Sequence, residues 1–166
     1  MTEIKYTYTP EIPEVFRCRV PLPGTLQAFV NNGVLRENLT DERFALESGD
    51  GMGIDFKVAP GQKVEDTIQV ISFRDSSDTS DISFASNVVF GRESSSSTLL
   101  CTHTLTLDKF KTDEIINIKA ESGSNSHIVI MENEHNESDH KFRINFSLAE
   151  SAFLRFNFFT LHGALL

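Results

Sequence analysis

The 166-residue sequence contains no tryptophan, two tyrosines and two cysteines, and each scarcity argues against a class of protein. Sugar-binding modules and nucleic-acid platforms favour Trp and Tyr, because these rings join a flat apolar face to a polar group. Two cysteines, Cys18 and Cys101, are too few for a disulfide scaffold and favour a reducing, cytoplasmic location. No apolar run is long enough to cross a bilayer, and no secretory signal opens the chain.

Positive charge is also scarce. The formal net charge is −9, which argues against a phosphate-binding surface and therefore against nucleic acid as a partner. Phenylalanine, by contrast, occurs 14 times. Because Phe lacks a polar group, we interpret most of these residues as core filler.

A repeat runs through 87–162, and its period is the spacing that separates Val88 from Ile116 and Ile116 from Ile144. Two short alternating segments recur in each unit, and a polar bend at 93–97, 121–125 and 149–151 separates them. At this period four columns of side chains coincide: Val88, Ile116 and Ile144; Phe90, Ile118 and Phe146; Leu100, Ile128 and Phe156; Thr102, Ile130 and Phe158. Such a period predicts a stacked β-solenoid, in which each unit buries its apolar faces against the next unit.

The residues before the repeat predict an entry into this stack. Asn32-Gly33, flanked by apolar residues, predicts a β-hairpin. A short helix is expected over 38–47, with Thr40 as its N-cap. The segments 54–58 and 64–73 are expected to be strands, and the second carries apolar residues on both faces, which predicts cover on both sides. We therefore divide the chain into a mixed entry region, 1–53, and β-helix rungs, 54–166.

The C-terminal segment 153–161 is nearly all apolar, and no polar capping element follows it. Solenoids need such caps at their ends. We therefore expect a truncated solenoid, a fragment of something longer. We also expect self-association through this strand, because an exposed apolar strand edge pairs readily with another chain.

Cys101 and His103 are the first candidate ligand pair. They lie two residues apart on an expected strand, so their side chains share one face. The positions one period further on are Val129 and Met131, which are poor company for a metal or a cluster. We favour a buried cysteine that behaves as a small hydrophobe over a ligand pair.

His135 and His140 are the second candidate pair, and Glu134 and Asp139 stand beside them. The spacing is compatible with a divalent metal site. The surrounding sequence is so polar that an exposed bend between rungs explains it equally well, and we favour the bend. The serine run 94–97 has no nucleophile-elbow motif. We therefore assign no catalytic, cofactor-binding or metal-binding residue.

Four strings in the chain resemble the SufB/SufD family of the Suf iron–sulfur cluster assembly system, and SufD in particular. They are VEDTIQVIS at 64–72, TLLCTHTL at 98–105, MENEHN at 131–136 and TLHG at 160–163. Their order and spacing agree with the family as well as their letters. The likeness is close from about Ser83 to the end and looser before Ile54.

The resemblance implies a right-handed parallel β-helix, cytoplasmic and without enzymatic activity. It implies a scaffold component that pairs with a SufB-like subunit and works with a SufC-like ATPase. An iron–sulfur cluster is implied only for the full assembly, with no cofactor in this chain. The later rungs of the family, with its pairing surface and its cysteine and histidine, have no counterpart here, so no functional residue is carried over.

Two other functions stay open from the residues alone. The first is a stand-alone β-rich module that binds a carbohydrate or another small ligand, for which we expect antiparallel sheets and a concave polar site. The second is a metal-dependent hydrolase, which would need metal at His135 and His140. A homodimer through the exposed C-terminal strand edge is a further expectation of the solenoid interpretation.

Overall fold

The computed structural model describes residues 24–104, 109–134 and 139–162. Within these ranges every regular element is a β-strand. The same residues include no helix that could cross a membrane. The strands are β1 (Thr25–Asn31), β2 (Val34–Leu35), β3 (Leu39–Thr40), β4 (Phe44–Ser48), β5 (Ile54–Val58), β6 (Thr67–Arg74), β7 (Ile82–Phe90), β8 (Ser95–Thr104), β9 (Lys111–Ala120), β10 (Asn125–Glu134), β11 (Asp139–Leu148) and β12 (Phe153–His162).

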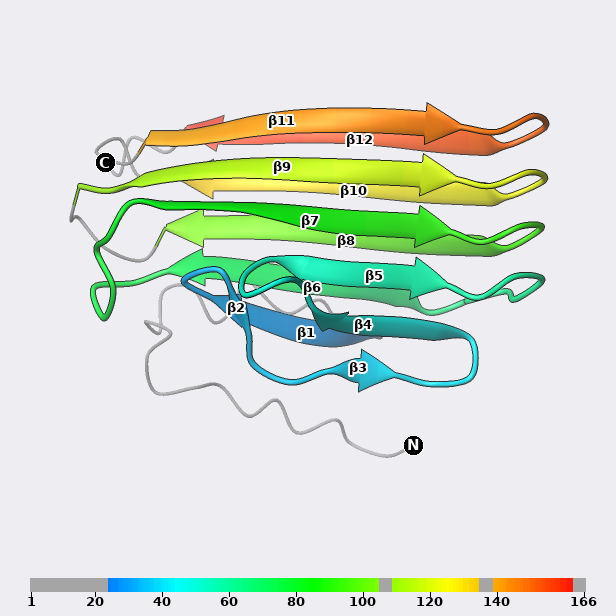
Figure 1. Cartoon of the computed structure of the whole chain (residues 1–166), viewed down its shortest axis with the longest axis horizontal. Helices are drawn as coiled ribbons and strands as arrows, with labels where there is room; N and C mark the ends of the chain where they lie inside the picture. The colour runs from blue at the N-terminus through cyan, green and yellow to red at the C-terminus, as the bar shows by residue number, and fades with distance from the viewer. Residues whose placement is uncertain (1–23, 105–108, 135–138, 163–166) are drawn as a thin grey trace.

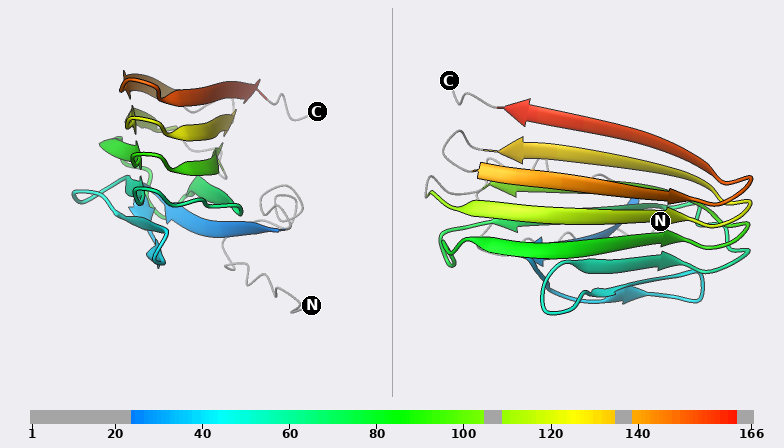
Figure 2. Two further views of the ribbon diagram at one scale, coloured as in Figure 1. Left: turned by 90° about the vertical axis from the view of Figure 1, so that its right-hand side faces the viewer. Right: turned by 45° about the horizontal axis from the view of Figure 1, so that its top comes forward.

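The strands form two facing six-stranded sheets (Figure 1). Sheet A has the order β12-β10-β8-β6-β1-β2, and sheet B has the order β11-β9-β7-β5-β4-β3. Every pairing among strands β5 to β12 is parallel, and so is the pairing of β1 with β6. The chain runs along the near sheet, returns along the far sheet and rises one strand spacing, which is a right-handed coil (Figures 1 and 2). The expected all-β parallel solenoid is confirmed.

The stacking offset differs from the expected one in the lower turns. Ile116 lies beside Ile144, as expected, because the offset between β9 and β11 is 28. Val88, however, pairs with Ile118 and not with Ile116, because the offset between β7 and β9 is 30. The sheet A columns shift in the same way. Leu100 pairs with Ile130 instead of Ile128, whereas Ile128 pairs with Phe156, as expected. A shift of two residues leaves the same side chains facing inward.

The two extra residues lie at one end of the coil. In the three upper rungs, the turns that lead from sheet B to sheet A have four residues each, 91–94, 121–124 and 149–152. The connections at the other end shorten from seven residues at 75–81 to six at 105–110 and four at 135–138. The period therefore changes from 30 to 28 along the stack without any interruption of the strands themselves.

The four-residue turns share one backbone conformation. Their third residue has a positive φ in every rung: Glu93 at 56°, Gly123 at 71° and Ser151 at 60°. The amide of the fourth residue donates to the carbonyl of the first, at 3.1, 3.0 and 3.2 Å in turn, which closes each turn. Gly61 occupies the equivalent place between β5 and β6, with a φ of 72°. Non-glycine residues rarely adopt this conformation, so the repeated turn imposes it on Glu93 and Ser151.

The core fills the space between the sheets. Inward residues alternate with outward ones, and the lower rungs bury Phe56, Phe90, Ile118 and Ile128 to 1% exposure or less. Phe56 packs edge-on against Phe90, with ring centroids 6.4 Å apart. Each such side chain contributes about 1.5–3 kcal/mol when it is fully buried. Stacking therefore supplies the stability that no single rung could provide.

The expected hairpin is confirmed. Asn32 and Gly33 both have positive φ, at 48° and 81°, and they join the antiparallel strands β1 and β2. The Asn32 amide also donates to Asp75 Oδ1 over 3.0 Å. Burial alone would raise the pKa of Asp75, but hydrogen bonds from Ser77 and Asn32 outweigh burial, and the net pKa is lowered.

The expected helix over 38–47 is wrong, because this segment forms the hairpin of β3 and β4. Asp41 Oδ1 accepts the backbone N–H groups of Arg43, at 2.7 Å, and of Phe44, at 3.3 Å. This local side-chain turn competes with a helical start. Phe44 and Leu46 then alternate inward and are buried at 3% and 0% exposure.

The strand expected to be covered on both faces is also confirmed. On β6, Ile68 and Val70 face the interior, whereas Gln69 and Ile71 face outward, and all four are buried. Gln69 accepts a hydrogen bond from the Thr25 hydroxyl at 3.2 Å. The burial of outward-facing side chains distinguishes this entry rung from the later rungs.

Candidate functional site

A buried polar cluster lies inside the coil at its variable-connection end. His140, on β11, turns inward, and its side chain is only 3% exposed. Its Nε2 lies 3.6 Å from Glu114 Oε2, and its Nδ1 lies 3.9 Å from Glu132 Oε1. The imidazole also stacks on Phe142, with centroids 3.9 Å apart. Three strands of the two sheets thus bring one imidazole and two carboxylates together.

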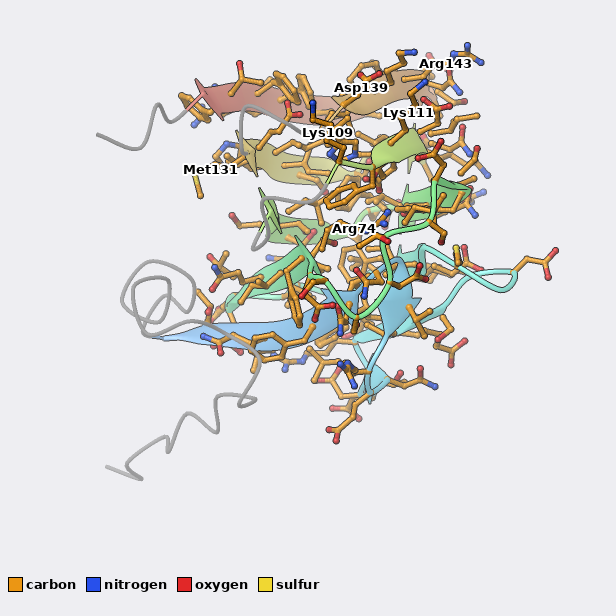
Figure 3. The ribbon with its side chains drawn as sticks, turned by 90° about the vertical axis from the view of Figure 1, so that its left-hand side faces the viewer. Arg74, Lys109, Lys111, Met131, Asp139 and Arg143 are labelled. Atoms are coloured by element: carbon orange, nitrogen blue, oxygen red, sulfur yellow. The ribbon has the colours of Figure 1, made fainter. Side chains whose placement is uncertain are left out.

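Further polar groups complete the cluster from the rungs below. The Ser86 hydroxyl donates to Glu114 Oε1 over 3.0 Å. Arg74, at the end of β6, donates to Thr112 Oγ1 over 3.1 Å and lies 4.2 Å from the centroid of the Phe110 ring. Figure 3 shows Arg74 within this end of the coil. Burial lowers the pKa of Arg74, and the nearby carboxylates of Asp78, Asp75 and Asp81 oppose that effect.

The cavities beside this cluster are small. Two of about 20 Å³ each reach Glu114, one lined by core residues from several rungs and one beside Thr112 and His140. A cavity of this size holds one water molecule. No small-molecule substrate fits either of them, because ligand pockets measure roughly 300–1,000 Å³. We infer that this cluster is an internal polar network.

The candidate ligand residues have different outcomes. His140 is on a strand and buried, so the exposed bend that we favoured is wrong for this residue. His135 lies outside the described residues. His140, Glu114 and Glu132 lie near one another, yet among the residues that the structure describes no three His, Cys, Asp or Glu side chains are arranged to hold a metal ion.

Cys101 and His103 lie on β8, and the change of offset alters their neighbours. The backbone of Cys101 pairs with Met131, and that of His103 pairs with Asn133, two positions beyond the expected Val129 and Met131. Only the backbone of these two residues is described.

A ladder of amides crosses the outer face of sheet B. Asn145 donates to Asn117 Oδ1 over 2.9 Å, Asn117 donates to Asn87 Oδ1 over 3.0 Å, and Asn87 donates to Asp55 Oδ1 over 2.7 Å. The four residues are direct neighbours in the sheet register. Sequence reasoning missed this ladder because the spacings between its members, 32, 30 and 28, do not fit one period.

The most exposed apolar surface lies at the last rung. We call β11 and β12 the open rung, because among the described residues each of these strands is hydrogen-bonded along one side only. Both are ten residues long. Large apolar side chains that are exposed gather on this rung: Phe146, Leu148, Phe153, Phe158 and Phe159. Unpaired strand edges of this length are templates for pairing with another chain.

Comparison with known proteins gives no further assignment: no family model, no curated protein and no solved structure matches the chain.

Proposed function

We propose that this chain is a SufD-like scaffold component of iron–sulfur cluster assembly, which acts by pairing with other proteins and not by catalysis. The observation that carries the proposal is the open rung, a paired set of ten-residue strand edges with exposed phenylalanines. The resemblance of 83–166 to SufD supplies the identity of the partners: a SufB-like subunit and a SufC-like ATPase.

The interior of the coil supports a non-catalytic role. Inside the coil, Glu114 lines both small cavities and His140 lines one of them, and each cavity holds a single water molecule. A substrate has no room in either of these internal cavities, although Glu114 also borders the shallow outer hollow of about 520 Å³. The chemistry proposed for the assembly therefore belongs to its other members, and this chain contributes a rigid surface.

A surface for carbohydrate is the weaker alternative. The larger hollows lie on the outer faces, one beside Asp113, Lys141 and Arg143 on sheet B, and one beside His127 and Arg155 on sheet A. Both hollows are shallow. Among the residues that the structure describes, neither hollow is lined by Trp or Tyr, the rings that sugar-binding sites favour.

Co-expression with defined partners tests the proposal. The tagged chain is produced together with a SufB-like subunit and a SufC-like ATPase, and the complex is isolated and sized by gel filtration. We expect co-elution with the SufB-like subunit, and loss of co-elution when Phe158 and Phe159 are replaced by Ser. Replacement of Val34, an exposed apolar residue at the opposite end, is the matched control. Failure of the SufB-like subunit to co-elute with the unmodified chain would refute the assignment.

A further inference from the structure

The hollow on the outer face of sheet A differs in charge from the rest of the molecule. It measures about 320 Å³ and lies where β8, β10 and β12 begin, directly after the four-residue turns. The whole chain has a formal charge of −9, yet among the described residues no Asp or Glu lines this hollow, whereas His127 and Arg155 do. A concavity lined by one sign of charge concentrates ions of the opposite sign. The hollow is therefore a candidate site for an anion.

The parallel register brings the polar side chains of three strands together in this hollow. Residues two apart on a strand share a face, and neighbouring strands lie about 4.7–4.9 Å apart. Side chains at matched positions therefore stand within reach of one ligand of a few ångströms. Two adjacent columns of outward residues result: Ser97, His127 and Arg155, and beside them Ser95, Asn125 and Phe153.

Arg155 supplies the charge. Within the described part of the chain, no carboxylate forms an ion pair with this exposed guanidinium. A guanidinium has five N–H donors and no acceptor, so all of its hydrogen-bonding capacity suits an anion. Its fork of N–H groups binds two oxygens of a phosphate or a carboxylate at once.

The neighbouring strands add neutral donors. The hydroxyls of Ser95 and Ser97 and the amide of Asn125 can each donate one or more hydrogen bonds. His127 is oriented by Asn157, whose Oδ1 lies 2.9 Å from the ring Nε2. This contact holds the ring on the outer face, in the column between the rungs of Ser97 and Arg155.

Two further serines border the hollow without serving it. The hydroxyl oxygens of Ser96 and Ser126 are buried, so they do not reach a ligand on the outer face. The donors that remain come from three strands, β8, β10 and β12. A phosphate group presents three terminal oxygens in different directions, whereas a carboxylate presents two in one plane. Donors on three successive strands therefore suit the phosphate better.

The hollow also has an apolar side and more room than a bare phosphate ion needs. Phe153 stands at its border with 57% of its surface exposed, and Val64 lines it from below. Its volume lies at the lower end of the roughly 300–1,000 Å³ of small-molecule sites. An organic group attached to the phosphate would find a phenylalanine ring to pack against.

We propose that this hollow binds a small phosphate monoester. The phosphate oxygens accept hydrogen bonds from Arg155, His127 and the two outward serines of β8, and the organic part packs against Phe153. The site lies on the outer face of sheet A, so it adds a ligand to the chain and does not depend on the pairing role under the proposed function.

A titration of the full chain, followed by its amide NMR signals, tests the site. Inorganic phosphate and phenyl phosphate are added separately, and NaCl at equal ionic strength is the control for screening. We expect saturable shifts centred on 95–97, 125–127 and 153–155. Phenyl phosphate should bind about three- to tenfold more tightly, because its ring contacts an aromatic side chain. Shifts that do not saturate, or that NaCl reproduces, would overturn the proposal.

Arginine variants test the position of the phosphate. Arg155→Ala should weaken both ligands about ten- to hundredfold, because hydrogen bonds from a charged donor are lost. Arg155→Lys keeps the charge but not the two-pronged geometry, so its affinity should be intermediate. Arg143→Ala, which removes an exposed arginine from the hollow of sheet B, is the matched control and should bind as the unmodified chain does. Equal losses at both arginines would indicate attraction to net charge alone and would overturn the site.

Phe153→Ser separates the ester from free phosphate. It should lower the affinity for phenyl phosphate to that for inorganic phosphate, and leave the affinity for inorganic phosphate unchanged. A preference for phenyl phosphate that survives this change would overturn the placement of the organic part. Circular dichroism confirms that each variant keeps the strand spectrum.

The results also separate this site from the proposed function. Saturable binding that Arg155→Ala removes supports the inference even when the SufB-like subunit does not co-elute. Co-elution without any saturable phosphate binding supports the scaffold and overturns the site.

Discussion

The solenoid places two identical side chains, Ile116 and Ile144, in one column but in different surroundings. Ile116 is 2% exposed, with strands on both sides of β9, whereas Ile144 is only partly buried on the open rung. We expect Ile116→Ala to lower the free energy of unfolding by about 2–5 kcal/mol, as for other buried Ile truncations. The same change at Ile144 removes a side chain with a neighbouring strand on one side, and we expect about 1–2 kcal/mol.

Urea denaturation followed by circular dichroism measures both values. The measurement is made at low protein concentration, because association through the open rung would bury Ile144 and increase the cost of its truncation. Raising the concentration should therefore enlarge the Ile144→Ala effect and leave the Ile116→Ala effect unchanged. Equal losses at low concentration would refute the idea that burial increases from the open rung inward.

Three other predictions follow from local contacts. Gly53→Ala should lower the melting temperature, since a Cβ there would lie 2.4 Å from a β7 carbonyl oxygen and φ is +79°; Gly51→Ala, with φ of +85° and open space, should cost less. Asp75→Asn should flatten the acid side of the stability curve: a lowered carboxyl pKa stabilises the fold above about pH 4, and that contribution is lost as the pH falls through the folded-state pKa. Elemental analysis after zinc loading should show no more metal in the unmodified chain than in His140→Ala, and a zinc content near one that this variant loses would restore the metal hypothesis.

The period of the apolar residues predicted the fold because inward and outward positions alternate with a period of two. The same fact concealed the register. Either offset, 28 or 30, keeps Val88 facing inward, so the sequence pattern does not distinguish Ile116 from Ile118 as its neighbour. The lengths of the connections between strands determine which offset is used, and the pattern of apolar residues carries no information about those lengths.

Local polar signals were the least informative part of the sequence. The Leu39, Thr40 and Phe44 pattern fits a helix N-terminus, yet Asp41 in the same segment closes a turn between two strands. His140 stands in a polar string and is nevertheless buried, because its partners, Glu114 and Glu132, come from other strands. Neither outcome could be read without knowing which strands are adjacent.

The unequal connections divide the molecule into a constant-length side and an adjustable side. Every sheet B to sheet A turn in the three upper rungs has four residues with the same left-handed third position, whereas the opposite connections range from seven residues to four. In these upper rungs extra chain is therefore accommodated at one end only, and it keeps the inward-facing side chains facing inward. A peptide epitope or fluorophore loop inserted within 75–81 should be accepted, whereas one inserted within 121–124 should shift all later rungs out of alignment.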